Sequence, residues 1–170
     1  MTLWRHLNQK PLNVSAVIAH YQAYWFKEAK NGCESQEDGS ACAQLGRLYQ
    51  EGEGVLIDKS LALKYFDKAC QLDSPEGCLA YANALAADSK DRNSSRTMQL
   101  KQRGVELMAQ ECETYTRWYC FPAAQEYEKG ENVGKDLTRA RRYCTLAFED
   151  KHEKPAKRRK DLNVRAARHS

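Results

Sequence analysis

The chain has 170 residues and a mass of 19.5 kDa, a length that fits one compact domain or one short repeat array. Charged residues make up 29% of the chain and the mean hydropathy is −0.79, but both signs of charge alternate, which argues against a disordered polyelectrolyte. Only 9 Gly and 4 Pro are present, which excludes a collagenous or low-complexity chain. We expect neither a membrane span nor a signal peptide, because no stretch is long and apolar enough for a span and the first residues lack an apolar core.

An amphipathic helix over residues 13–33 is the first expected element. It is rich in aromatic residues, namely Tyr21, Tyr24, Trp25 and Phe26. We assign residues 1–38 to an N-terminal extension that contains this helix.

An internal repeat organises the middle of the chain. Residues 52–58 (GEGVLID) match residues 130–136 (GENVGKD), and a tyrosine lies three positions before each segment. Three cysteines open related segments that start 36 and 42 residues apart, namely Cys42, Cys78 and Cys120. Agreement among three copies predicts repeated units, which we place at residues 39–74, 75–112 and 113–150.

Each unit is expected to form two helices. In the first unit, Leu45, Leu48 and Tyr49 follow the spacing of one helical face, and a second helix over about residues 59–72 has its own apolar stripe. Gly52 lies between these helices and suits the positive φ of a tight turn. No strand-like alternation of useful length occurs. The predicted fold is therefore all-α, a right-handed α/α solenoid of antiparallel helix pairs with about three repeats plus an N-terminal helix.

The C-terminal tail, residues 151–170, has a different composition. It carries eight Lys or Arg and two acidic residues, a net charge of +6, whereas the whole chain carries +4. The KRRK run at residues 157–160 fits either a solvated end or a phosphate-binding segment. The tail lacks the interleaved aromatic residues on which bases stack, which disfavours nucleic-acid binding.

Three segments carry a resemblance to Sel1-like repeats, which are related to tetratricopeptide repeats: residues 41–49 (ACAQLGRLY), 52–55 (GEGV) and 65–70 (YFDKAC). The resemblance covers roughly residues 39–150 and is strong in the first and third units. The middle unit departs from it, because its turn at residues 88–95 is polar and lacks glycine. Tetratricopeptide repeats are the nearest alternative, but their period of about 34 residues fits less well. The resemblance implies that the helix at residues 13–33 is a lone second helix that caps the stack.

The same resemblance bears on the seven cysteines. The chain resembles the cysteine-rich type of the family, which is found among bacterial secreted proteins and mitochondrial intermembrane-space assembly factors. This resemblance implies three disulfides: Cys33–Cys42, Cys70–Cys78 and Cys112–Cys120. Cys144 is then a free thiol at a core-facing position. Disulfides imply an oxidising compartment (periplasm, cell exterior or intermembrane space), whereas seven reduced thiols imply a cytoplasmic protein. The pairing of Cys33 stays open, because Cys33 lies three positions beyond the register of the repeat.

Sequence motifs for catalysis and metal binding are missing. The chain has no G-x-S-x-G, S-x-x-K, P-loop or H-E-x-x-H motif, no C-x2-C pair, and no histidines at ligand spacing. We therefore expect no metal, no cofactor and no enzyme activity. Two alternatives stay open: a weak β-lactam-binding or hydrolysing enzyme, since some cysteine-rich members of the resembled family are associated with β-lactams, and nucleic-acid binding through the tail.

Protein recognition is the usual task of helix-pair solenoids. The expected function is a non-catalytic interaction module, used as an adaptor, an assembly factor or an immunity-type binder, whose partner is another protein. The expected partner-binding residues are Gln44, Arg47, Asn83, Gln125, Trp118 and Tyr115. The first four belong to one polar face of the stacked first helices. Trp118 either anchors the partner or fills the junction between units.

Overall fold

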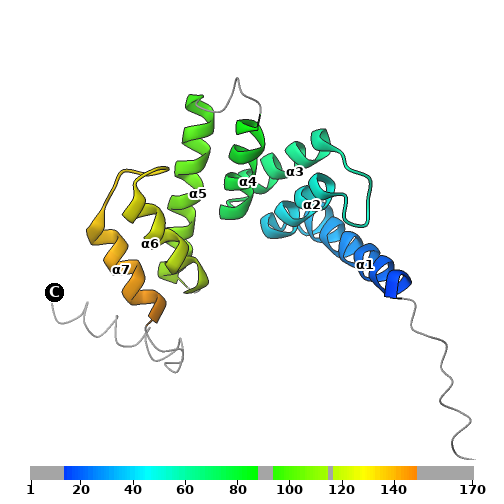
Figure 1. Cartoon of the computed structure of the whole chain (residues 1–170), viewed down its shortest axis with the longest axis horizontal. Coiled ribbons are helices and arrows are strands. Elements are labelled where there is room, and N and C mark those ends of the chain that lie inside the picture. The colour runs from blue at the N-terminus through cyan, green and yellow to red at the C-terminus, as the bar shows by residue number, and fades with distance from the viewer. Residues whose placement is uncertain (1–13, 88–93, 115–116, 149–170) are drawn as a thin grey trace, which may run out of the picture. The chain divides into compact units, whose positions relative to one another are not determined.

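The structure, a computed structural model, describes residues 14–87, 94–114 and 117–148, and every regular element in these ranges is helical (Figure 1). The elements in chain order are α1 (Val14–Ser35), α2 (Gly39–Glu51), α3 (Lys59–Gln71), α4 (Pro75–Ala86), α5 (Ser95–Thr114), the 3-10 turn η1 (Arg117–Tyr119), α6 (Cys120–Lys129) and α7 (Leu137–Phe148). The expected all-α helical-repeat fold is confirmed. None of the described helices is both long and apolar enough to cross a membrane.

Two compact units divide the chain, Met1–Met108 and Ala109–Ser170, and we call them unit 1 and unit 2. In unit 1, α2 packs against α1, α3 and α4, and α3 also packs against α4. In unit 2, α6 packs against α7. The middle turn at residues 88–93 and the tail at residues 151–170 lie outside the described residues.

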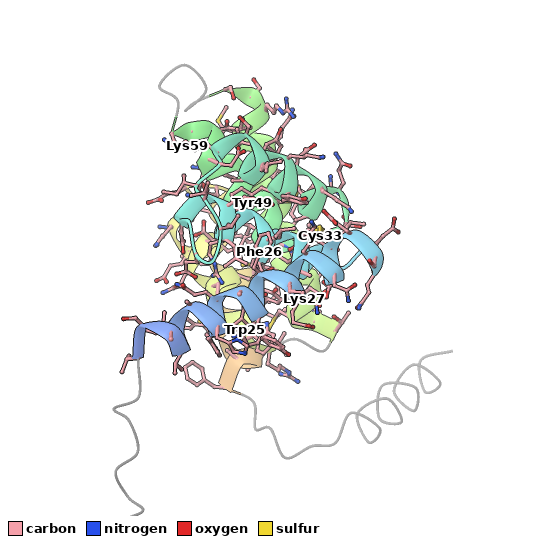
Figure 2. All side chains as sticks on the ribbon, turned by 90° about the vertical axis from the view of Figure 1, so that its right-hand side faces the viewer. Trp25, Phe26, Lys27, Cys33, Tyr49 and Lys59 are labelled. Atoms are coloured by element: carbon pink, nitrogen blue, oxygen red, sulfur yellow. A yellow bond between two sulfur atoms is a disulfide. The ribbon has the colours of Figure 1, made fainter. Side chains whose placement is uncertain are left out.

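α1 is held against the body of unit 1 from Gln22 onward, where its backbone lies against Gly54 in the turn after α2. The buried residues of α1 are Ala29, Gly32 and Cys33, all near its C-terminal end. Phe26 lies on the side of α1 that faces Tyr49 of α2, and the two rings meet edge to face at 5.6 Å (Figure 2). The residues of α1 before Tyr21 extend past these contacts.

The same turn follows the first helix in both matched segments. Gly52 ends α2 with a φ of 77°, a left-handed conformation that glycine adopts without strain. The backbone N–H of Asp58 then donates to the carbonyl of Tyr49 at 2.9 Å, and Asp136 donates to Tyr127 at the same distance in unit 2. Both aspartates accept hydrogen bonds from the first amides of the helix that follows, which caps it. The repeated sequence pattern is therefore the pattern of this turn.

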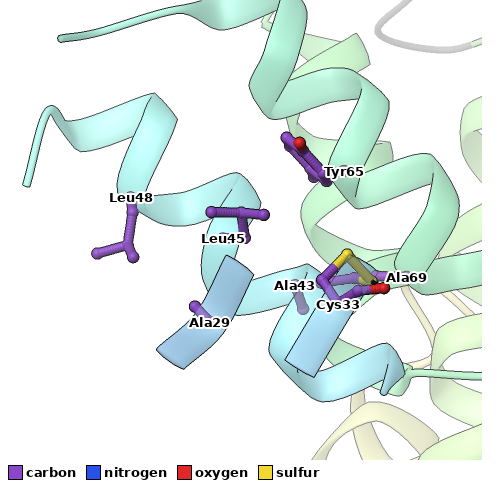
Figure 3. Close-up of a cluster of buried hydrophobic side chains, with 8 residues drawn as sticks. Ala29, Cys33, Ala43, Leu45, Leu48, Tyr65 and Ala69 are labelled. Carbon is purple, nitrogen blue, oxygen red and sulfur yellow. Dashed lines mark hydrogen bonds between the residues drawn. A yellow bond between two sulfur atoms is a disulfide. The ribbon is translucent and has the colours of Figure 1, made fainter. Parts of the chain in front are cut away.

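Small residues let the helices of unit 1 approach closely. Figure 3 shows one buried cluster, with Ala29 and Cys33 from α1, Ala43, Leu45 and Leu48 from α2, and Tyr65 and Ala69 from α3. A Cβ atom on Gly46 of α2 would lie 2.6 Å from the ring of Phe66 on α3, so a larger residue does not fit there. Phe66 is only 1% exposed, and burial of such a side chain stabilises the fold by about 2–3 kcal/mol.

Three cysteine pairs lie at disulfide geometry, each at a junction between one helix pair and the next. They are Cys33–Cys42 between α1 and α2, Cys70–Cys78 between α3 and α4, and Cys112–Cys120 between α5 and α6, with Cα–Cα distances of 4.5, 4.4 and 4.8 Å. Cys33, whose pairing the sequence leaves open, lies beside Cys42. The first two junctions each contain one residue in the left-handed region, Glu37 with a φ of 53° and Asp73 with a φ of 57°. These residues reverse the chain within the short loop.

At each of two junctions, a tyrosine forms a hydrogen bond with a glutamate of the preceding helix pair. Tyr65 of α3 donates from its hydroxyl to the carboxylate of Glu34 at 2.8 Å, and Tyr143 of α7 donates to Glu113 at 3.3 Å. Each glutamate directly follows a paired cysteine. α3 therefore contacts the end of α1 as well as α2, and α7 contacts the end of α5 as well as α6.

We expect protein purified from its native compartment to contain these three disulfides. Each closes a loop of eight or nine residues and stabilises the fold by about 2.5 kcal/mol in the chain-entropy model. Reduction should therefore cost about 7 kcal/mol in total and lower the Tm by roughly 20 °C. Peptide mapping without reductant should show the three local pairs and an alkylatable Cys144, and Cys144→Ser should keep the native Tm. Pairs that link different junctions, or alkylation of all seven thiols, would contradict this arrangement.

Tyr65 should make the stability of the chain depend on alkaline pH. Burial, with the hydrogen bond to Glu34, raises the pKa of Tyr65 to about 12, whereas tyrosine in an unfolded chain titrates at about 10. The folded state thus retains the phenol proton, and this contribution to stability is complete below about pH 10 and lost as the pH rises towards about 12. Urea unfolding at a series of pH values should show the loss.

Tyr65→Phe should reduce this pH dependence, because it removes the titrating group. Tyr21→Phe changes a tyrosine that is exposed on α1 and should behave as the native chain does. If the native chain and both variants lose stability equally between about pH 10 and 12, Tyr65 is not the group responsible.

Candidate functional site

A hollow of about 440 Å³ opens between α2 and α4 in unit 1. Gln44 and Arg47 of α2 and Asn83 of α4 line it, and the ring of Phe66 forms part of its wall. Its other lining residues, none among the expected binding residues, are Ser40, Ala43, Gln50, Glu51, Glu76 and Ala80. The structure therefore brings three of the expected binding residues to one concave surface.

A second hollow of about 250 Å³ adjoins the first and extends to α1. The two hollows share Gln44 and Arg47, and the second is also lined by Tyr21 and Trp25 of α1. We call the two hollows together the α2 groove. Sequence reasoning did not assign Tyr21 and Trp25 to a site, although their spacing of four residues places them on one side of a helix.

The α2 groove combines amide, aromatic and charged side chains. Gln44 and Asn83 each offer both donors and an acceptor, the set that pairs with a peptide backbone. Tyr21 and Trp25 meet edge to face at 5.7 Å and provide apolar area at one end. The lining contains one arginine and three glutamates (Glu51, Glu53 and Glu76), so the formal charge of the groove is acidic.

In unit 2, Trp118 stands out into solvent. The side chain lies in η1 and is 76% exposed, and Phe121, one turn later, is 48% exposed. η1 is held in place by Arg117, whose guanidinium donates to the carbonyl of Leu146 at 2.6 Å. Among the described residues of unit 2, Trp118 is therefore exposed and does not pack in the interior of that unit.

Three other expected residues are placed as follows. Gln125 is exposed on α6 in unit 2, and the structure describes unit 2 by itself. Tyr115 lies outside the described residues. Cys144 is half-buried on α7, so it is less buried than Phe66, with which it aligns in the repeat. Within the described ranges, no group of three or more His, Cys, Asp and Glu side chains is placed to hold a metal ion.

The Sel1 repeat family model matches residues 39–74 and 123–152 of this chain. Two segments of the chain are thus similar to Sel1 repeats. The first match covers α2 and α3, and the second covers most of α6 and all of α7. Both matched segments contain the glycine–aspartate turn described above, and the middle helix pair, whose turn departs from the pattern, is not matched.

Among solved structures, the chain is similar to a Sel1 repeat protein from Oxalobacter formigenes. The sequence identity is 21% and the TM-score is 0.47, over 78% of this chain and 56% of that protein. The chain thus spans little more than half the length of that protein. No curated protein matches the chain.

We expect Trp118→Ala to leave the stability of the chain almost unchanged. An exposed substitution away from the core typically changes the free energy of unfolding by less than about 0.5 kcal/mol. Phe66→Ala is the contrasting variant, because it empties a buried site and should cost about 3–5 kcal/mol. Thermal unfolding measures both, and a fall of many degrees for Trp118→Ala would show that Trp118 packs in the interior.

Proposed function

We propose that this Sel1-repeat chain is a non-catalytic module that binds a segment of another protein in the α2 groove. Sel1 repeats generally mediate protein–protein interactions. The observation that supports the groove as the binding surface is that two hollows meet at Gln44 and Arg47 and run over α1, α2 and α4. An adaptor, an assembly factor or an immunity-type binder would each use such a groove.

The shape of the groove favours an extended peptide over a small molecule. Its two hollows are shallow neighbours on the surface of three helices rather than one enclosed cavity. Carboxamides that line such a surface replace the water around a peptide backbone with paired donors and acceptors. The aromatic pair at the α1 end offers apolar area for one side chain of the bound segment.

The charge of the groove favours a partner segment with basic residues. Glu51 and Glu76 lie in the first hollow and Glu53 in the second, against the single cation Arg47. Charge complementarity of this kind raises the association rate and discriminates against acidic partners. We therefore propose a segment that carries Lys or Arg together with one large apolar residue.

The cysteines support a proposal about the compartment of this interaction. Three pairs at disulfide geometry are compatible with an oxidising environment. We propose that the chain meets its partner outside the reducing cytoplasm, where the junctions keep their bridges.

A displayed library of random peptides provides a probe that needs no known partner. Selected peptides should be enriched in basic and aromatic residues, and Arg47→Ala combined with Asn83→Ala should weaken their binding by about ten-fold or more, about 1.4 kcal/mol. Lys64→Ala, an exposed change on α3 outside the groove, is the matched control and should bind as the native chain does. Titration calorimetry or fluorescence polarisation measures the affinities.

Two further variants test how far the binding surface extends. Gln125→Ala and Trp118→Ala, both exposed in unit 2, should weaken binding only if the partner also contacts this unit. Peptides whose affinity is unchanged by the groove pair would contradict the α2 groove as the binding surface.

A further inference from the structure

The first half of α1 carries an apolar seam that no described element of unit 1 covers. Val14, Val17, Tyr21 and Tyr24 follow one another at intervals of three, four and three residues. This is the spacing of the contact positions of a coiled coil, which keeps one line of side chains on one side of a helix over two heptads. Ile18 widens the same line. We call these five residues the α1 seam.

The α1 seam is exposed along its whole length. All five side chains are 51–64% exposed, whereas the buried residues of α1 lie in its last two turns. The side of α1 that contacts α2 is a different one, marked by Phe26 against Tyr49 (Figure 2). A contiguous apolar line of this kind on a soluble domain marks an interaction surface.

The aromatic end of the seam is already ordered. Trp25 meets Tyr21 at 5.7 Å and Tyr24 at 5.6 Å, both edge to face. Three rings that hold one another lose little side-chain entropy on binding, since their rotamers are restricted in advance. The cluster therefore suits the contact with another helix.

The charge distribution of α1 indicates which helix covers the seam. No Asp, Glu, Lys or Arg occurs between Val14 and Phe26, and the first charged residue of the helix is Lys27. A symmetric contact brings identical groups face to face, so a charged surface would repel its own copy. A charge-free seam avoids this repulsion, and it offers no charge by which a particular foreign partner would be selected.

The area of the seam sets the strength of such a contact. Five side chains at about half exposure, with Trp25 beside them, offer on the order of 600 Å² per copy if each contributes about 100 Å². Two copies would bury roughly 1,200 Å², which is the lower limit of stable specific interfaces. The contact is therefore strong enough to form and weak enough to depend on concentration.

We propose that the α1 seam pairs with the α1 seam of a second copy of this chain and forms a reversible homodimer. The pairing does not require the α2 groove to bind a partner, so it stands apart from the proposed function. Because Tyr21 belongs both to the seam and to the groove, Val17 and Ile18, which do not line the groove, are the positions to vary.

Sedimentation equilibrium of the full chain tests the pairing. We expect the native chain to change from monomer to dimer as its concentration rises, with a Kd on the order of 10 µM. Val17→Glu and, as a second variant, Ile18→Glu should be monomeric throughout, because two like charges would face each other. Leu56→Glu, which changes an 88% exposed apolar residue in the loop after α2, is the matched control and should dimerise as the native chain does.

A mixture of charge variants tests whether the seam meets a second copy of itself. Val17→Glu and Val17→Lys should each be monomeric alone and should associate when mixed, since opposite charges then face each other. Circular dichroism should show native helix content in every variant. Restored association supports the pairing of two seams.

Three results would overturn the proposal. The first is a native chain that stays monomeric at millimolar concentration. The second is a dimer that persists in Val17→Glu and Ile18→Glu. The third is a mixture of Val17→Glu and Val17→Lys that stays monomeric. If a monomeric native chain co-sediments with vesicles of anionic and neutral phospholipid, and Val17→Glu does not, a lipid surface covers the seam instead of a second copy.

Discussion

The close junction between successive helix pairs is the constraint on which the rest of the structure depends. At each junction the end of one second helix and the start of the next first helix approach to a Cα distance below 5 Å at a cysteine pair. A gap this short fixes the direction in which the next pair leaves, so that α2 and α4 come side by side in unit 1. The α2 groove exists because of this arrangement, since Arg47 and Asn83 come from first helices on either side of a junction. At the α1–α2 junction, the hydrogen bond from Tyr65 to Glu34 adds a contact that orients α3 against α1.

Two neighbouring parts of unit 1 carry opposite chemistry. The α2 groove is lined by carboxamides and glutamates and suits a polar, extended segment. The α1 seam beside it is free of charge and suits another apolar helix. The exposure of the α1 seam follows from the position of α1 at the N-terminal end of the described helices. α3 has a first helix on each side of it, α2 and α4, whereas α1 packs along one first helix only among those described, α2, so a side that would otherwise be covered stays exposed.

Much of the fold and part of the α2 groove could be predicted from the sequence, because the repeat encodes local structure. The turn from Gly52 to Asp58 needs a left-handed glycine and a helix cap, and both leave a sequence signature. Helical spacing placed Gln44 and Arg47 on one face for the same reason. The exposure of Trp118 could not be predicted, because an aromatic residue at a junction fits a core and an interface equally well. The wall that α1 contributes to the groove depends on how α1 crosses α2, which no local pattern specifies.

The two cysteines of each pair are also close together along the chain, with separations of 9, 8 and 8 residues. Loops of this length close within about 10–100 ns, far faster than contacts between distant segments form. Six cysteines can pair in about 15 ways, but for each of these six the shortest loop is the one closed with its structural partner. As the chain is synthesised or exported from its N-terminus, each pair is complete before the next cysteine pair emerges. Oxidation can thus proceed in chain order, one junction at a time, with little need for an isomerase to correct mispaired intermediates.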